Sequence, residues 1–203
     1  MISMAKKIIL ALIIIIAIAI FVIFTISSSY VNVYIDGENV SVESYSLSNF
    51  KNTNLNNDIC DLTLNIMDDP QSNITTLKDE IKTLCQEYNL EDVTVNIDSC
   101  IGENQIPVIV YVDGTSMLPT LQDGQSVLLN KTHDIHIGDI VVAESSEYGG
   151  IIKRVGDIDG DSVYLESDNK NVSYEYINGE LYEIKGITTW VDISDINGVV
   201  IEY

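Results

Sequence analysis

Positively charged residues are scarce in this chain of 203 residues. Lysine and arginine together number 10, against 31 aspartates and glutamates, and the formal net charge is −21. A surface this acidic repels phosphate groups, so the composition argues against nucleic-acid binding. We therefore expect no nucleic acid among the partners of this protein.

Cysteine and histidine are also rare. The three cysteines are Cys60, Cys85 and Cys100, and there are two histidines. No C-x-x-C pair or other metal-ligand spacing occurs, so a metal site has no support in the sequence. Three cysteines cannot all pair within one molecule, which leaves open either buried thiols or one disulfide with one free thiol.

One long apolar run is present, at residues 8–26, "IILALIIIIAIAIFVIFTI", where only Thr25 is polar. At about 1.5 Å per residue, such a helix would cross roughly 30 Å of hydrocarbon. The small residues Ser27–Ser29 would also suit a cleaved secretory signal. Because the apolar part of such a signal is usually about 7–15 residues long, the run favours an uncleaved membrane anchor.

The lysines near this run predict its orientation. Lys6 and Lys7 precede it, and the next basic residue is Lys51. The positive-inside rule then places residues 1–7 in the cytoplasm and residues 27–203 on the outer face of the cell membrane. We expect a single-pass protein whose chemistry takes place beside the lipid bilayer.

Residues 27–57 are rich in Ser, Asn and Tyr, and they predict a stalk or an edge hairpin. The hairpin would use a strand at Tyr30–Ile35 and a turn at Asp36-Gly37.

Residues 58–100 predict a small α+β module with the order β-α-β. Alternation suggests strands at Ile59–Met67 and Val93–Ile97. Between them, apolar residues recur at intervals of three and four, which indicates a helix capped by Ser72 or Asn73. The positions on its apolar face are Ile74, Leu77, Ile81, Leu84 and Tyr88.

Residues 101–203 predict an all-β domain, because short apolar runs alternate with turns that contain Gly, Asp or Asn. The expected strands lie at Ile106–Val112, Val127–Leu129, Asp139–Ala143, Ile151–Val155, Ser162–Leu165, Leu181–Ile184, Ile187–Val191 and Val199–Ile201.

A candidate nucleophile, Ser116, follows the first of these strands in the stretch "GTSMLPTL". A serine hydroxyl needs a base to take its proton. Lys153, in "GGIIKRVGD", shares a strand face with Ile151 and Val155. An apolar environment would lower the pKa of this lysine and make it a general base.

Two alternatives to this base remain open. Lys153 could instead extend its ammonium group to water from an edge strand. His133 and His136 are familiar bases, but they lie in the polar stretch "KTHDIHIGD", and we interpret them as surface residues.

The stretches "GTSMLPTL", "GDIVVAE" and "IIKRVGD", in this order, resemble the type I signal peptidase family of Ser-Lys peptidases. The resemblance implies that Ser116 is the nucleophile, that its backbone N–H contributes to the oxyanion hole, and that Lys153 is the general base. It implies a structural role for Gly138–Val142. The resemblance also implies a dyad of the bacterial type, because the endoplasmic-reticulum relatives place a histidine at the lysine position.

Further similarity lies in "SDNKNVSYEY" and in the closing segment "SDINGVVIEY", so the resemblance covers about residues 106–203. It implies that Asp168 and Asn169 support the dyad and that Ser173 orients Lys153. The implied fold is a mainly β catalytic domain of the signal-peptidase type, preceded by one transmembrane helix and the β-α-β module.

Two departures from the family pattern stand out. Gly114 occupies the position where many bacterial members carry a hydroxyl group that assists the oxyanion hole. Glu175, Tyr176 and Ile177 replace the Asp-Ser-Arg ending of the later box.

The implied function is removal of signal peptides from exported precursor proteins, with no metal or organic cofactor. The precursor would bind as an added β-strand. The residues expected to pair with it are Val110, Tyr111, Val112, Gly114, Ile151 and Ile152. Two alternatives are a Ser-Lys peptidase dedicated to one surface precursor and a catalytically silent, membrane-anchored binding protein of the same fold.

Overall fold

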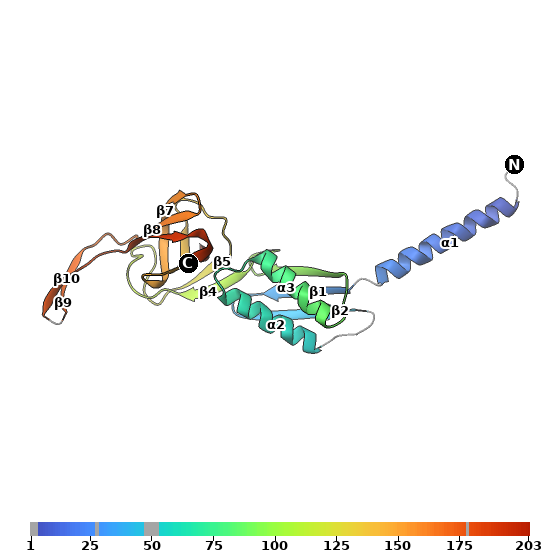
Figure 1. Cartoon of the computed structure of the whole chain (residues 1–203), viewed down its shortest axis with the longest axis horizontal. Coiled ribbons are helices and arrows are strands. Elements are labelled where there is room, and N and C mark those ends of the chain that lie inside the picture. The colour runs from blue at the N-terminus through green and yellow to red at the C-terminus, as the bar shows by residue number, and fades with distance from the viewer. Residues whose placement is uncertain (1–3, 27–28, 47–52, 178) are drawn as a thin grey trace.

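The computed structural model describes residues 4–26, 29–46, 53–177 and 179–203. Figure 1 shows a helix, α1, at one end of the molecule, then a sheet with two helices, then a β domain from which a hairpin extends.

Helix α1 spans Met4–Ile26, and its described side chains are Lys6 and those of residues 9–20, all exposed. Among the helices in the described ranges, none is long and apolar enough to cross a membrane. The anchor predicted at residues 8–26 is therefore a proposal and not a structural finding.

The next unit contains a three-stranded sheet of β1 (Ser29–Ile35), β2 (Val40–Tyr45) and β3 (Val93–Ser99), in the order β2-β1-β3. Strands β1 and β2 are antiparallel, whereas β1 and β3 are parallel. The strand at Tyr30–Ile35 and its hairpin turn are confirmed. The hairpin belongs to the sheet, so residues 29–46 do not form a separate stalk.

The strand predicted at Ile59–Met67 is wrong, because this segment lies within helix α2 (Thr53–Asp68). Leu62, Leu64 and Ile66 alternate as in a strand. The side chains that are buried, however, include Leu55, Ile59 and Ile66, whose spacing of about one or two helical turns places them on one helix face. The unit therefore has the order β-β-α-α-β, and the β-α-β prediction is corrected.

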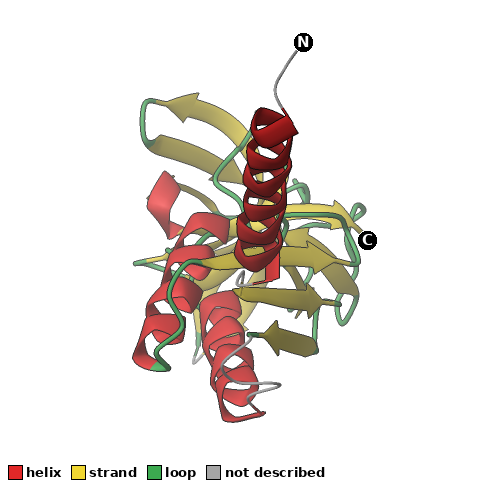
Figure 2. Ribbon diagram, turned by 90° about the vertical axis from the view of Figure 1, so that its right-hand side faces the viewer, coloured by secondary structure: helices red, strands yellow, loops and turns green. Residues whose placement is uncertain are grey.

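The predicted helix over Ile74–Tyr88 is confirmed as α3 (Ile74–Glu87). The Asn73 side chain caps it by accepting hydrogen bonds from the backbone N–H groups of Thr75 and Thr76. Figure 2 shows α2 and α3 together on one side of the strands. The predicted strand at Val93–Ile97 is confirmed as β3.

The remaining strands confirm the predicted β domain. Seven form one sheet in the order β11-β8-β7-β6-β12-β5-β4, and β9 and β10 form a separate two-stranded hairpin. The local sequence pattern does not indicate β9. The strands are β4 (Pro107–Tyr111), β5 (Ser126–Asn130), β6 (Ile140–Ser145), β7 (Gly149–Asp159), β8 (Ser162–Glu166), β9 (Ser173–Ile177), β10 (Glu180–Ile184), β11 (Thr188–Asp192) and β12 (Ile196–Glu202), with a short 3-10 helix, η1 (Ile193–Asp195).

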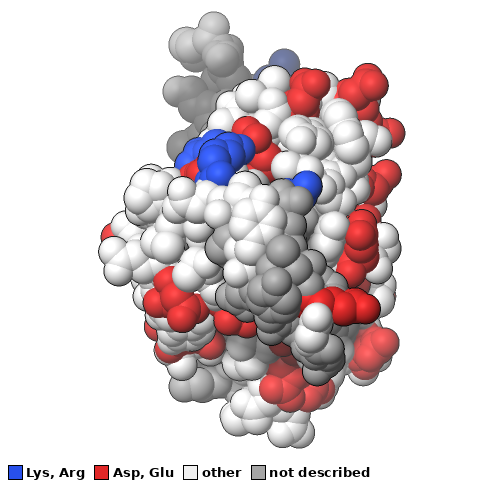
Figure 3. Space-filling view, turned by 90° about the vertical axis from the view of Figure 1, so that its left-hand side faces the viewer, with Lys and Arg blue, Asp and Glu red and all other residues white. Residues whose placement is uncertain are grey.

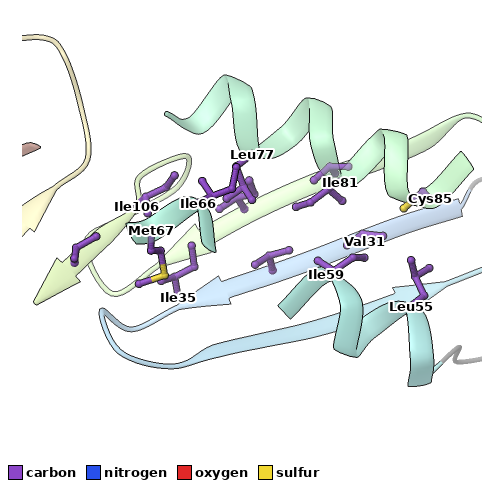
Figure 4. Close-up of a cluster of buried hydrophobic side chains, with 14 of the residues drawn as sticks. Val31, Ile35, Leu55, Ile59, Ile66, Met67, Leu77, Ile81, Cys85 and Ile106 are labelled. Carbon is purple, nitrogen blue, oxygen red and sulfur yellow. The ribbon is translucent and has the colours of Figure 1, made fainter. Parts of the chain in front are cut away.

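A shared core joins the helix-covered sheet to the β domain. One buried cluster contains Ile35 and Met67 from the helix-covered unit together with Ile106, Val108 and Leu129 from the β domain. Ile106 directly precedes β4, Val108 lies in β4, and Leu129 lies in β5. Figure 4 shows Ile106, Met67 and Ile35 close together at one end of this cluster. Because well-packed cores are stiff, the N-terminal unit fixes the position of β4.

Candidate active site

The serine loop begins where β4 ends. The Val112 N–H donates to the Gln125 carbonyl oxygen at 2.9 Å, which holds the loop on β5. Gly114 has a φ of +88°, and its N–H donates to Asp123 Oδ1 at 2.8 Å. This positive φ favours glycine, so the loop turns sharply two residues before Ser116.

Met117, directly after Ser116, is fully buried. It packs in a cluster with Val112, Leu121, Ile140 and Ile152, which come from the serine loop and from β6 and β7. The methionine therefore fixes the backbone beside the serine, while Ser116 itself is half-buried. A nucleophile needs this combination of a rigid backbone and an accessible hydroxyl group.

Strand β7 brings Lys153 to the serine. Its side chain is 3% exposed, and its ammonium nitrogen donates to Ser116 Oγ at 2.8 Å and to the Ile152 carbonyl oxygen at 2.8 Å. Burial disfavours the charged form and lowers the lysine pKa below its ordinary value of 10.5. The structure thus joins the two residues singled out in the sequence, and it excludes the alternative of a solvent-facing lysine.

Asp168 ties three elements together beside the dyad. Its two carboxylate oxygens accept hydrogen bonds from Arg154 Nε and Nη2, both at 2.7 Å. Thr120, at the end of the serine loop, donates its hydroxyl group to the same carboxylate at 2.5 Å. These bonds hold the Asp168 pKa below its usual range. The local sequence pattern does not indicate this contact of Thr120.

Asn169 holds the serine loop through two bonds. Its backbone N–H donates to the Ser116 carbonyl oxygen at 2.9 Å. Its side-chain amide donates to the Thr115 carbonyl oxygen at 2.9 Å. Asp168 and Asn169 therefore position the loop and do not contact the hydroxyl group of Ser116.

Ser173 begins strand β9, where it pairs with Ile184 of β10. Its side chain lies outside the described residues, as do those of Glu175, Tyr176 and Ile177. The orientation of Lys153 by Ser173 thus stays a prediction.

Neither histidine contacts the dyad. His136 is exposed, and its Nδ1 lies 3.8 Å from an oxygen of Asp139. His133 is half-buried, and its Nε2 lies 3.0 Å from the Ile196 carbonyl oxygen, which corrects its interpretation as a plain surface residue. Cys60, Cys85 and Cys100 are free thiols, so the disulfide alternative is not realised.

Strand pairing limits which backbone groups could hold a substrate. Because Val112 donates inward to β5, the alternating pattern also turns Val110 toward β5 and leaves Tyr111 on the outer edge. On β7, Val155 bonds Asp139, so the same alternation places Ile152 on the edge away from β6. A substrate could therefore use the backbone of Tyr111 and the N–H of Ile152, whose carbonyl oxygen already accepts from Lys153. Of the other residues predicted to pair with substrate, Val110, Val112 and Ile151 turn toward neighbouring strands, and the Gly114 N–H is bonded to Asp123.

Comparison with known proteins also indicates a peptidase. The Peptidase S24-like family model matches residues 80–189. Signal peptidase I U of Bacillus subtilis (strain 168) is 33% identical over 89 residues, covering 38% of this chain and 48% of that protein. Signal peptidase I V of the same organism is 33% identical over 82 residues, covering 38% of this chain and 46% of that protein. No solved structure gives a significant match.

The chain spans about half the length of the curated relatives that it matches. The matched family region begins within helix α3 and ends in β11, and it contains both Ser116 and Lys153. The chain therefore belongs to the Peptidase S24-like family and is a signal-peptidase-like protein.

Proposed function

We propose that this protein is a serine endopeptidase that removes signal peptides from exported precursor proteins, with Ser116 as nucleophile and Lys153 as general base. One observation carries the proposal: a buried lysine nitrogen lies 2.8 Å from the hydroxyl oxygen of a serine on a rigid loop. The curated relatives, which are named signal peptidases, support the choice of substrate.

The reaction follows from the dyad. Neutral Lys153 accepts the proton of Ser116 Oγ as that oxygen attacks the scissile carbonyl carbon. The resulting ammonium group gives the proton to the leaving amine, and an acyl-enzyme ester forms on Ser116. Lys153 then accepts a proton from water as the water oxygen attacks the ester, and it returns this proton to Ser116 Oγ when the ester bond breaks. The new carboxyl group gives its own proton to the released amine or to solvent, so Ser116 and Lys153 return to their starting forms and one water molecule is consumed.

The oxyanion of the tetrahedral intermediate would be stabilised by the backbone N–H of Ser116. The N–H of Gly114 does not serve this purpose, because it already donates to Asp123. Gly114 also brings no hydroxyl group, unlike the residue at this position in many bacterial members. The Ile152 carbonyl oxygen orients Lys153, and a further contact from Ser173 is part of the proposal on sequence similarity alone.

Attachment to a membrane is a separate part of the proposal. It is supported by the apolar run at residues 8–26 and by the exposed aliphatic side chains of residues 9–20. Lys6 and Lys7 favour a cytoplasmic N-terminus and a catalytic domain on the outer face. Anchoring would raise the effective concentration of membrane-bound precursors at the active site.

The test is cleavage of secretory precursors by the full chain in lipid vesicles. Wild type should cut at the signal junction, Ser116→Ala should not, and Lys153→Ala should cut far more slowly than wild type. Lys82→Ala is a matched control, because Lys82 is exposed and pairs only with Asp79 among the described residues. Wild type that cuts none of several unrelated precursors would refute the proposal, and wild type that cuts one alone would indicate a dedicated peptidase.

A further inference from the structure

The turn between β1 and β2 lies against the outer edge of β4, the strand that leads to Ser116. The carbonyl oxygen of Gly37 accepts a hydrogen bond from the Ile109 N–H at 3.4 Å. Strand β4 is at the end of its sheet, so Ile109 would otherwise present this N–H to solvent or to an added strand.

Packing at this contact is close as well as polar. A Cβ atom added to Gly37 would lie 3.1 Å from Ile109 Cγ1 and 3.5 Å from Leu128 Cδ1. Gly37 also has a φ of +104°, which other residues rarely adopt. Because the hydrogen bond is long, the backbone of the turn blocks the edge mainly by occupying the space.

The turn itself is rigid. The Asp36 carboxylate accepts bonds from the backbone N–H groups of Glu38 and Asn39, at 3.1 and 2.7 Å. The Asp36 N–H donates to the Asn39 carbonyl oxygen at 3.1 Å. Such a closed turn holds its position and does not swing aside for a substrate strand.

The outer edge of β4 thus has a covered part and a part that is open to an added strand. Pro107 has no N–H to offer, and the N–H of Ile109 is covered by Gly37. Tyr111 is the next outward-facing residue, it is 69% exposed, and the alternation of β4 points its N–H away from β5. An added strand could therefore pair with β4 from Tyr111 toward Ser116 and no further back.

We propose that the β1–β2 turn is a specificity-determining stop, which limits substrate pairing on β4 to the residues nearest the scissile bond. The open edge runs from Tyr111 to the turn at Gly114, and at about 3.3 Å per extended residue the whole span to Ser116 accommodates at most roughly four or five substrate residues. The proposal rests on the proposed peptidase function. It assigns the N-terminal α+β unit a role in selecting substrates by the length of the segment that is read.

The test uses the full-length protein and synthetic signal-junction peptides with single backbone N-methyl groups at successive positions on both sides of the scissile bond. N-methylation removes a donor that strand pairing needs. In wild type, cleavage should slow at least about fivefold for N-methyl groups within roughly five residues of the bond, and should be unchanged for more distant ones.

Gly37→Val should displace the turn and extend this sensitivity to more distant positions. Gly160→Val is the matched control, because Gly160 also has a positive φ, +61°, but a Cβ there meets nothing within 4 Å. The amide hydrogen of Ile109 provides a readout independent of activity: its exchange should be slow in wild type and in the control, and fast in Gly37→Val.

The outcomes separate this proposal from the function on which it rests. Wild type that cuts no peptide refutes both the peptidase function and the stop. Wild type that cuts, but is slowed by distant N-methyl groups, overturns the stop alone. A Gly37→Val variant with fast Ile109 exchange and an unchanged N-methyl profile also overturns it.

Discussion

The amine nitrogen of Lys153 lies 2.8 Å from the hydroxyl oxygen of Ser116, although the two residues are 37 positions apart in the chain. Two different supports create this proximity. Met117 buries the backbone beside the serine, and Ile151 and Val155 bury the strand that carries the lysine. A base that is largely sealed from water loses its proton more readily, so packing and chemistry are coupled here.

Cleavage should rise with pH. The reactive form of Lys153 is the neutral amine, and burial lowers its pKa below 10.5. Activity is therefore absent well below the lowered pKa and increases as the pH rises through it. Initial rates of precursor cleavage, measured on a chain shown to be folded at each pH, check this expectation. A rate independent of pH between 6 and 10 would contradict a lysine base.

Removal of the base should cost about 10²–10⁴ in rate, the usual contribution of general-base catalysis. Lys153→Ala and the similarly sized Lys153→Met should both show this loss, the latter while keeping the buried volume filled. Single-turnover measurements give the chemical step directly. Equal rates for wild type and Lys153→Met would refute the assignment.

The Arg154–Asp168 pair should control the position of the serine loop. Asp168→Asn removes a charged partner from Arg154 and weakens the bond to Thr120, so we expect roughly a tenfold loss of cleavage with a smaller change in substrate affinity. Rates and KM values for the variant check this. Asp134→Asn, at an exposed carboxylate, is the control and should behave as wild type.

The same pair should matter for acid stability. Because the folded-state pKa of Asp168 is lowered, its stabilising contribution is present above the unfolded value of 3.8 and is lost as the pH falls through the folded value. Urea unfolding at pH 6 and at pH 3 should therefore show a smaller decrease for Asp168→Asn than for wild type. An equal decrease would mean that the pair contributes no proton-linked stability.

A second buried lysine should affect stability and not catalysis. Lys131 is 3% exposed, donates to Asn197 Oδ1 at 2.6 Å, and has its pKa lowered to about 8 by burial. Between that value and 10.5 the unfolded chain binds the proton more strongly, so wild type gains stability as the pH rises. Relative to Lys131→Met, the gain from pH 7 to pH 10 should be about 2 kcal/mol in the free energy of unfolding. A constant difference between the two proteins would contradict the lowered pKa.

Gly186 should be intolerant of any side chain. A Cβ there would lie 2.7 Å from the Asn169 carbonyl oxygen and 2.7 Å from Ser167 Cβ, so Gly186→Ala must displace the segment that holds the serine loop. We expect destabilisation of about 1–3 kcal/mol and a loss of cleavage. Gly150→Ala, where the nearest atom is a Glu144 side-chain oxygen at 3.4 Å, is the control for thermal stability. Equal melting temperatures would contradict the close contact.

Among the charged side chains on the face in Figure 3, acidic ones are spread over the surface, whereas basic ones lie only in its upper part. The net charge of −21 therefore appears on the surface as an extended negative field. Such a field repels phosphate groups.

Membrane attachment has its own test. Wild-type protein should float with lipid vesicles, and the double variant Ile14→Lys, Ile16→Lys should not, because each charge at the centre of a spanning helix costs about 2.5–3.5 kcal/mol. Lys82→Ala serves as a control that changes charge far from α1. Flotation of the double variant would show that α1 is not the anchor.

Local pattern alone determined much of this protein. Apolar residues at intervals of three and four identified α3, the polar residues before it limited the cap to Ser72 or Asn73, and Gly- or Asp-containing turns separated the strands of the β domain. The apolar neighbours of Lys153 on its own strand face indicated a desolvated lysine. These features depend on residues close in sequence, where backbone periodicity fixes which side chains share a face.

Tertiary structure decided the rest, because it depends on contacts between distant segments. The strand predicted at Ile59–Met67 is helix α2, because the alternation of Leu62, Leu64 and Ile66 fits either element. Only the contacts of this segment with the sheet decide between strand and helix. The link between Thr120 and Asp168, the buried Lys131 and the contact of Gly37 with Ile109 have no local signature. These features depend on residues that are far apart in the sequence or buried by distant segments. Their distance in space cannot be predicted from their positions in the chain, because packing of the folded chain determines it.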